Sequence, residues 1–132
     1  MRSSKSALSS GRKDPLLSRI RKLCLSLPET SESSSWGHPN FRAGKRTFVT
    51  FEHIGGDDTI AFHLHPFDVE VLEKRPGFTR TPYGQGRWVS LHTRPRPNWT
   101  VIEGLVLASY RQVALKRMLL KLEKSDATQE SL

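Results

Sequence analysis

Apolar residues recur at helical spacing near the start of the chain. Asp14-Pro15 is a typical helix start, because an aspartate side chain can cap backbone N–H groups and proline fits the first helical position. The apolar residues that follow share one side of a helix: Leu16, Leu17, Ile20, Leu23, Cys24 and Leu27. Pro28 ends the pattern. The segment from 15 to 27 is therefore predicted to be an amphipathic helix.

A second, longer helical pattern follows Asn98, which is the expected N-cap. Its first apolar stripe consists of Ile102, Leu105, Val106, Ser109, Tyr110 and Val113. A slightly shifted stripe then contains Leu115, Met118, Leu119 and Leu122. The shift predicts a kink or break near Ala114. Residues 125–132 are polar and are expected to form a frayed C-terminus.

The segment between the two helices shows the alternation that is typical of strands. Residues 41–52 predict two strands that turn at Gly44-Lys45, because glycine tolerates the positive φ of a tight turn. Residues 59–65 and 86–92 alternate apolar and polar positions and predict two more strands. Residues 67–74 fit a short helix. The order of elements predicts an α+β fold, with an antiparallel sheet and the N- and C-terminal helices packed on one face.

Length and composition narrow the class of protein. A chain of 132 residues supports one domain, which we place at residues 14–124. Residues 1–13 are rich in Ser, Arg and Lys and are expected to be a disordered basic tail. No apolar stretch approaches the roughly 18 residues of a membrane helix, and Cys24 is the single cysteine. We therefore expect a cytoplasmic protein, without membrane contact, and favour a monomer.

The charge balance is strongly basic. The formal net charge is +8, and the first 30 residues contain seven basic and two acidic side chains. An excess of positive charge raises the affinity for polyanions without giving sequence specificity. The basic tail could equally serve only solubility.

Candidate catalytic and metal-binding residues do not form a recognisable constellation. His63-Leu64-His65 places two imidazoles on one face of a strand, but a zinc site needs further ligands. Asp57-Asp58 fits a polar hairpin turn as well as a cation site. Gly84-Gln85-Gly86 lacks the Lys-Ser/Thr of a phosphate-binding loop. We expect no enzymatic activity, no metal and no cofactor.

A surface that combines basic and aromatic residues is the remaining candidate. The residues concerned are Arg42, Lys45 and Arg46 around the first hairpin, then Arg80, Tyr83, Gln85, Arg87 and Trp88 around the second loop, and then Arg94 and Arg96 in a stiff Arg-Pro-Arg-Pro loop. Cationic side chains neutralise phosphates, and flat rings stack on bases. The alternative is that Trp88 belongs to the core and that the arginines are only solvated.

Several short segments, in this order and spacing, resemble the MmcQ/YjbR family of small bacterial proteins. They are Leu27-Pro28-Glu29-Thr30, Pro39 with Phe41, Gly44-Lys45 with Phe48, Pro76-Gly77-Phe78, Pro82-Tyr83 to Gly86 and Trp88, Ser109-Tyr110-Arg111, and Lys116-Arg117. The resemblance covers about residues 14–124. It implies a fold similar to the CyaY (frataxin-like) arrangement of two helices against an antiparallel sheet.

The family is labelled as DNA-binding, with two hairpins acting as a double wing. By resemblance, the wings here would be the Arg42–Arg46 hairpin and the Tyr83–Trp88 loop. Iron binding by frataxin-like proteins is not implied, because the first helix here is basic.

Two functions therefore stay open from the sequence. The first is a non-enzymatic protein that binds DNA or another nucleic acid through the basic hairpins. The second is a small-ligand or protein-interaction domain with an aromatic pocket formed by Trp36, His38, Tyr83 and Trp88.

Overall fold

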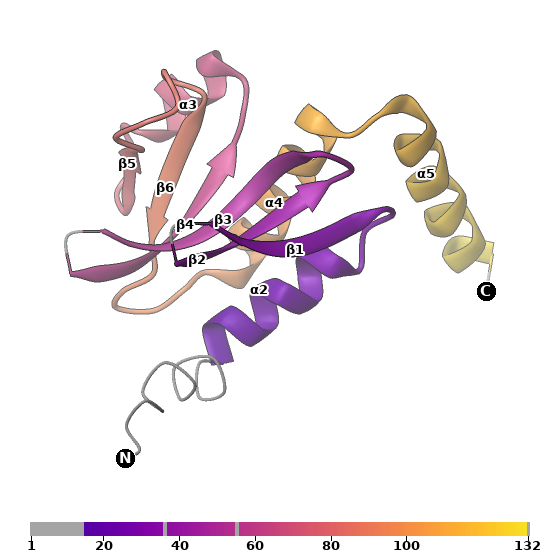
Figure 1. Cartoon of the computed structure of the whole chain (residues 1–132), viewed down its shortest axis with the longest axis horizontal. Coiled ribbons are helices and arrows are strands. Elements are labelled where there is room, and N and C mark those ends of the chain that lie inside the picture. The colour runs from indigo at the N-terminus through magenta and orange to yellow at the C-terminus, as the bar shows by residue number, and fades with distance from the viewer. Residues whose placement is uncertain (1–14, 36, 55, 132) are drawn as a thin grey trace.

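Figure 1 shows the fold as a computed structural model, which describes residues 15–35, 37–54 and 56–131. The predicted tail at residues 1–13 lies outside this range. In chain order the described elements are α2 (Pro15–Leu25), β1 (Thr30–Ser35), β2 (His38–Ala43), β3 (Arg46–Ile54), β4 (Asp57–His63), α3 (Pro66–Leu72), β5 (Phe78–Arg80), β6 (Trp88–His92), α4 (Trp99–Val113) and α5 (Lys116–Ser131). Among these helices, none is long and apolar enough to cross a membrane.

The predicted α+β class is confirmed. The six strands form one antiparallel sheet in the order β1-β2-β3-β4-β6-β5. Helix α2 packs on β1 and β2, and α4 packs on β3 and β4. The two helices also contact each other, since the Arg19 guanidinium lies 4.2 Å from the ring centre of Trp99. Helices α2 and α4 therefore share one face of the sheet, as predicted for the segments near 15–27 and 100–113.

The helix ends follow the sequence signals. Pro15 is the first residue of α2, and the Asn98 side chain accepts a hydrogen bond from the Val101 N–H at 3.2 Å. Helix α4 ends at Val113 and α5 begins at Lys116. Ala114 between them has an extended backbone. The predicted break near Ala114 is confirmed.

Two strands were not predicted. Strand β1 has the sequence TSESSS, which contains no apolar residue, and β5 is only three residues long. Both lie at the edges of the sheet. An edge strand needs fewer buried side chains than a central one, so it can form without an alternating apolar pattern.

The core lies between the helices and the inner strands. Its largest fully buried side chains include Tyr110, Phe41, Phe48, Phe62, Ile20, Ile60, Ile102 and Met118. Between β2 and β3 the register shifts, so that Phe41 pairs with Val49 but Arg42 pairs with Thr47. This bulge leaves Phe48 as an extra residue, and its ring meets Tyr110 edge to face at 5.6 Å between centroids.

Helix α5 projects away from the sheet, as Figure 1 shows. It is held at its start by the buried side chains of Met118 and Leu122. The Glu29 carboxylate, at the end of the α2–β1 connection, also receives hydrogen bonds from Arg117 at 2.7 Å and from Lys121 at 2.9 Å. The backbone is helical through Ser131, so the expected fraying of residues 125–132 stays a prediction about motion.

The contacts of Glu29 predict that the docking of α5 depends on pH. Arg117 and Lys121 lower the pKa of the Glu29 carboxyl from 4.5 to about 2. Because the folded-state pKa is the lower one, the ion pairs contribute fully above about pH 4.5 and are lost as the pH falls through about 2. We expect Glu29→Gln to speed amide exchange in α5 near neutral pH, and this difference from wild type to shrink in acid.

Glu123→Gln is the matched control, because Glu123 is exposed on α5 and has no ion pair within the described residues. If both variants exchange like the wild type, Met118 and Leu122 alone hold the helix.

Candidate nucleic-acid interface

The β2–β3 hairpin places three predicted basic residues at one end of the sheet. Its turn is Gly44-Lys45, with Gly44 at φ +64°. The Gly44 N–H donates to the Glu29 carbonyl at 3.0 Å, and a Cβ at Gly44 would lie 3.3 Å from the Met118 methyl. The turn is therefore held between the α2–β1 connection and α5. Lys45 and Arg46 are exposed, and Arg42 is half-buried.

The loop between β5 and β6 reaches the same end of the sheet. Gly84, Gln85 and Gly86 have φ values of +86°, +52° and +79°. The Leu64 N–H then donates to the Arg87 carbonyl at 2.9 Å, which places Arg87 beside the end of β4. The Tyr83 hydroxyl donates to the Glu52 carboxylate on β3. The loop thus joins β6 to β4 and β3.

His63 marks the point where the hairpin and the loop meet. It pairs with Trp88 in the β4–β6 register, and the two rings are edge to face at 5.1 Å between centroids. The pKa of His63 is lowered by burial first and then by the positive charges of Arg46 and Arg87. Both cations therefore act on one imidazole, although they come from segments that are about forty positions apart in the sequence.

We call the cluster of Arg42, Lys45, Arg46 and Arg87 the basic end. Within the described residues, none of these four cations has an acidic partner. The buried Arg42 Nε and His63 Nδ1 atoms also lack a hydrogen-bond partner there. Buried polar atoms are rarely left without partners, so these two atoms mark incomplete hydrogen bonding beside the basic end.

The other predicted contact residues have partners inside the protein. Arg80 donates to the Glu73 carboxylate at 2.5 Å, so its charge is compensated. Trp88 is covered by His63 and by Gly84, where an added Cβ would lie 2.3 Å from the indole. Tyr83 is 46% exposed, but its hydroxyl is bound to Glu52. Among the predicted cations of the first hairpin and the second loop, the four of the basic end are thus those without an acidic partner within the described residues.

The predicted aromatic pocket is only partly within the described residues. Trp36 lies outside them. His38 is half-buried at the start of β2, where it pairs with Ser35 of β1. Tyr83 and Trp88 are on the other side of β3 and β4, in the loop before β6 and at its first residue. The Tyr83 hydroxyl nevertheless reaches Glu52 of β3, the strand next to β2, so the aromatic pocket stays a prediction.

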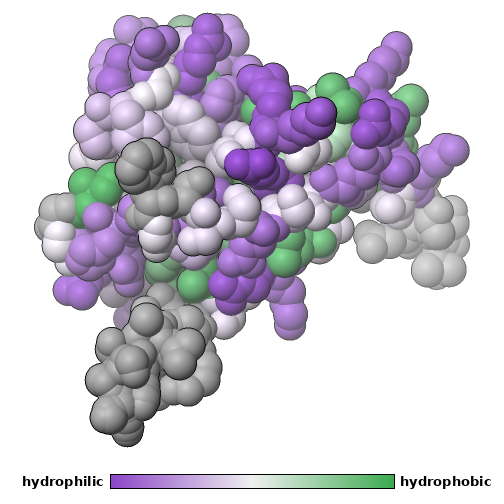
Figure 2. Space-filling view, viewed as in Figure 1, coloured by the Kyte–Doolittle hydropathy of each residue, from purple (hydrophilic) through white to green (hydrophobic). Residues whose placement is uncertain are grey.

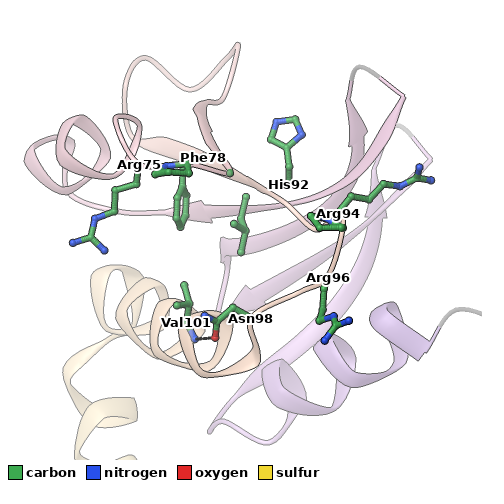
Figure 3. A pocket seen from close by; sticks show the side chains of 11 residues that line it. Arg75, Phe78, His92, Arg94, Arg96, Asn98 and Val101 are labelled. Carbon is green, nitrogen blue, oxygen red and sulfur yellow. Dashed lines mark hydrogen bonds between the residues drawn. The ribbon is translucent and has the colours of Figure 1, made fainter.

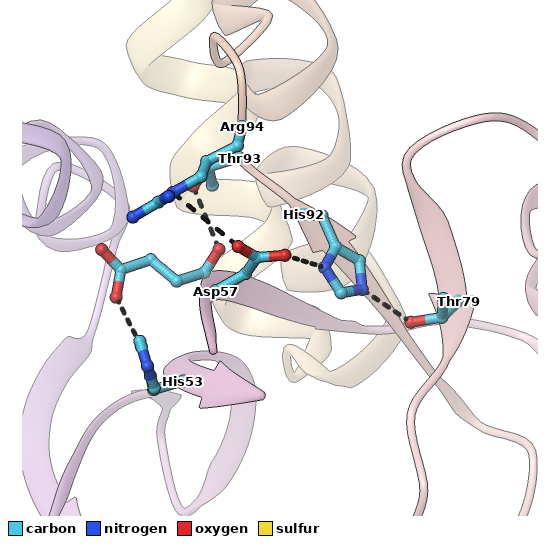
Figure 4. Close-up of polar contacts among 7 residues, drawn as sticks. His53, Asp57, Thr79, His92, Thr93 and Arg94 are labelled. Carbon is cyan, nitrogen blue, oxygen red and sulfur yellow. Dashed lines mark hydrogen bonds and ion pairs between the residues drawn. The ribbon is translucent and has the colours of Figure 1, made fainter. Parts of the chain in front are cut away.

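A second polar cluster lies at the opposite end of β4 (Figure 4). Asp57 lies 3.4 Å from His92 Nδ1 and 3.7 Å from Arg94, and His92 Nε2 lies 3.2 Å from the Thr79 hydroxyl. Asp58 pairs with His53 at 3.1 Å. These contacts tie the β3–β4 turn to β6 and β5. Within the described residues, no group of three or more His, Cys, Asp or Glu side chains is placed to hold a metal ion.

The visible surface gives no sign of a large apolar interface. Figure 2 shows mostly purple and pale residues, with green residues in separate patches. Large contiguous apolar patches mark protein or membrane contacts, whereas nucleic-acid interfaces are more polar.

The comparison with known families decides the identity. The YjbR family model matches residues 25–112, which include the hairpin, the β5–β6 loop and most of α4. The chain belongs to the YjbR family. The resemblance inferred from the short motifs is confirmed for this family, also described as MmcQ/YjbR or DUF419.

Two solved structures are similar to this YjbR chain in fold. A protein from Pseudomonas syringae matches with a TM-score of 0.63 and 16% identity, over 75% of this chain and 98% of that one. The Deinococcus radiodurans protein DR2400, which has a DUF419 domain, matches with a TM-score of 0.65 and 16% identity, over 81% and 87%. No curated protein is significantly similar in sequence. At this identity the two structures support the fold alone.

Proposed function

We propose that this YjbR-family chain is a non-enzymatic nucleic-acid-binding protein, with DNA as the expected ligand. The observation that carries the proposal is the basic end, where a hairpin and a loop bring together four cations that have no acidic partner within the described residues. Such cations attract phosphate whatever the base sequence. Their fixed backbone positions reduce the conformational freedom that is lost on binding.

The contacts expected at the basic end are mainly to phosphate. Arg42, Lys45, Arg46 and Arg87 would each neutralise backbone charge. The pKa of His63 is lowered, first by burial, so His63 adds no positive charge to this site near neutral pH and is not proposed as a contact residue. Trp88 is half-buried, and its ring packs against His63 and Gly84. Base stacking on Trp88 is therefore not part of the proposal.

We include the absence of catalysis in the proposal because the titratable side chains of Figure 4 pair with one another. Asp57, Asp58, His53 and His92 hold strands together through these contacts. This supports a structural use of these residues.

The test is a binding titration at several salt concentrations with the full chain. We expect replacement of all four basic-end cations by glutamine to weaken binding to duplex DNA strongly. Each phosphate contact that is lost should lower the slope of log K against log salt by about 0.9. Single-stranded DNA, RNA and heparin are measured in parallel, since equal binding to heparin would indicate a general polyanion binder and not a nucleic-acid protein.

A matched control removes the same charge elsewhere. Lys22, Lys74, Arg111 and Lys116 are exposed, lie outside the basic end and have no ion pair in the described part of the chain. Their replacement by glutamine lowers the net charge equally and leaves the N-terminal tail intact. If both quadruple variants lose the same affinity, net charge or the tail carries binding, and the basic end does not.

A further inference from the structure

A cavity lies on the helix side of the sheet, away from the basic end. It has a volume of about 500 Å³ and lies between the β5–β6 edge and the first turn of α4. This volume falls within the range of small-molecule sites, roughly 300–1,000 Å³. None of the four basic-end cations lines it. The cavity therefore needs its own explanation.

The floor of the cavity is apolar. Phe78 of β5 pairs in register with Leu91 of β6, and both line the cavity together with Val101 of α4. Figure 3 shows Phe78 pointing toward Val101 and Asn98, while the His92 ring points away from them. Val101 is 36% exposed although it is apolar. A ligand that covers these side chains would remove apolar surface from water.

The rim of the cavity is positively charged. Three arginines line it, Arg75, Arg94 and Arg96, and among the described residues no carboxylate does. Arg94 lies 3.7 Å from Asp57, whereas Arg75 and Arg96 have no ion pair within the described residues. In Figure 3 these two side chains stand on opposite sides of the space above α4. Long arginine side chains can turn toward an anion that enters between them.

The N-terminus of α4 adds to the positive potential. Asn98 and Val101 line the cavity, and the 15-residue helix that starts between them has no acidic residue in its first turn. The partial positive charge of a helix N-terminus favours anions. The cavity thus combines an apolar floor with two separate sources of positive charge.

A second cavity of about 340 Å³ shares Arg75 with the first one. It lies between α3 and α4, and its lining includes Leu64, Val71, Leu72, Leu105 and Ala108, with Asp68 as the other charged residue. Val71 is 44% exposed. The apolar surface therefore continues on both sides of Arg75, which leaves room for a hydrocarbon body longer than the first cavity.

We propose that the cavity between β5–β6 and α4 binds a small amphipathic carboxylate, an acyl or aryl-alkyl acid. The apolar body lies on Phe78, Leu91 and Val101. The carboxylate is held by Arg75 and Arg96 at the mouth, near the N-terminus of α4. Arginine suits this role because its guanidinium matches the two oxygens of a carboxylate.

The test uses octanoate as the probe and 1-octanol as an uncharged probe with the same hydrocarbon chain. We expect saturable amide shifts at Phe78, Leu91 and Val101 when octanoate is titrated into the full chain and followed by NMR. Because the carboxylate can accept bidentate, charge-assisted hydrogen bonds that the octanol hydroxyl cannot, octanoate should bind at least about tenfold more tightly than octanol. Equal affinities for the two probes, or no saturable shifts at these residues, would overturn the proposal.

Two variants separate charge from folding. Val101→Glu puts a carboxylate into the cavity, and an acidic residue in the first turn favours the helix, so the fold should be kept while octanoate affinity falls at least about tenfold. Arg75→Gln should weaken the binding of octanoate and leave the affinity for octanol unchanged. Arg111→Gln, on the exposed last turn of α4 and outside the cavity, is the control and should change neither. Unchanged octanoate binding in Val101→Glu would place the ligand elsewhere.

Discussion

Replacement of Tyr110 by alanine should destabilise the fold by about 3–5 kcal/mol, because it removes the largest fully buried side chain. The Tyr110 ring packs on Phe48, and its hydroxyl donates to the Pro28 carbonyl at 2.7 Å. This hydrogen bond links α4 to the end of the α2–β1 connection. Burial and the nearby Glu29 charge raise the pKa of Tyr110, so the hydroxyl remains a donor at neutral pH.

Tyr110→Phe separates the two contributions. It keeps the ring but leaves the Pro28 carbonyl without its donor, which should cost about 1–3 kcal/mol. Urea unfolding measures both variants. Tyr83→Phe is the control, since Tyr83 is 46% exposed whereas Tyr110 is fully buried, so we expect a smaller effect. If the urea midpoint of Tyr110→Phe equals that of the wild type, water replaces the hydrogen bond of the Tyr110 hydroxyl to the Pro28 carbonyl.

Gly84→Ala should also destabilise the protein, by about 2–5 kcal/mol. Gly84 has φ +86°, where an alanine is strained by about 1–2 kcal/mol. An added Cβ would in addition lie 2.3 Å from the Trp88 ring, so either the indole or the loop must move, which costs about 1–3 kcal/mol. The same movement would displace Arg87 from the end of β4.

Gly56→Ala is a matched control for this strain. Gly56 also has φ +86°, but a Cβ there would meet nothing within 4 Å among the described residues. The difference in unfolding free energy between the two variants therefore reports the contact with Trp88. Gly84→Ala should weaken nucleic-acid binding as well, whereas Gly56→Ala should not. Equal destabilisation by both would show that the loop accommodates the methyl group freely.

The sequence predicted those elements whose apolar residues repeat regularly. The α2 and α4 helices and the β2, β3, β4 and β6 strands have such repeats, and each was expected at nearly its observed place. Strand β1 was not, because its serines form a strand only through pairing with β2. The apolar periodicity also could not show which residues of one helix face are the most deeply buried. Leu23 is only partly buried, whereas Ile20 is fully buried.

The basic end was predictable in part. Its residues were named from two separate segments, and the structure supplies their proximity through the β4–β6 pairing and the Leu64–Arg87 hydrogen bond. Which cations stay unpaired was not predictable, since the Arg80–Glu73 contact depends on how α3 lies against β5. The cavity was missed altogether. Arg75 and the Arg94–Pro97 loop were visible as basic residues, but nothing in the sequence joins them to Val101.

The strand order has a consequence for how the chain folds. The first four strands are neighbours in sequence as well as in the sheet, so each pair closes a short loop. Pairings of this kind have low contact order and form quickly. The bond from Tyr110 to Pro28, by contrast, spans 82 positions. We therefore expect a folding nucleus in the β2–β3–β4 meander, with the docking of α4 as the late step that makes the structure cooperative.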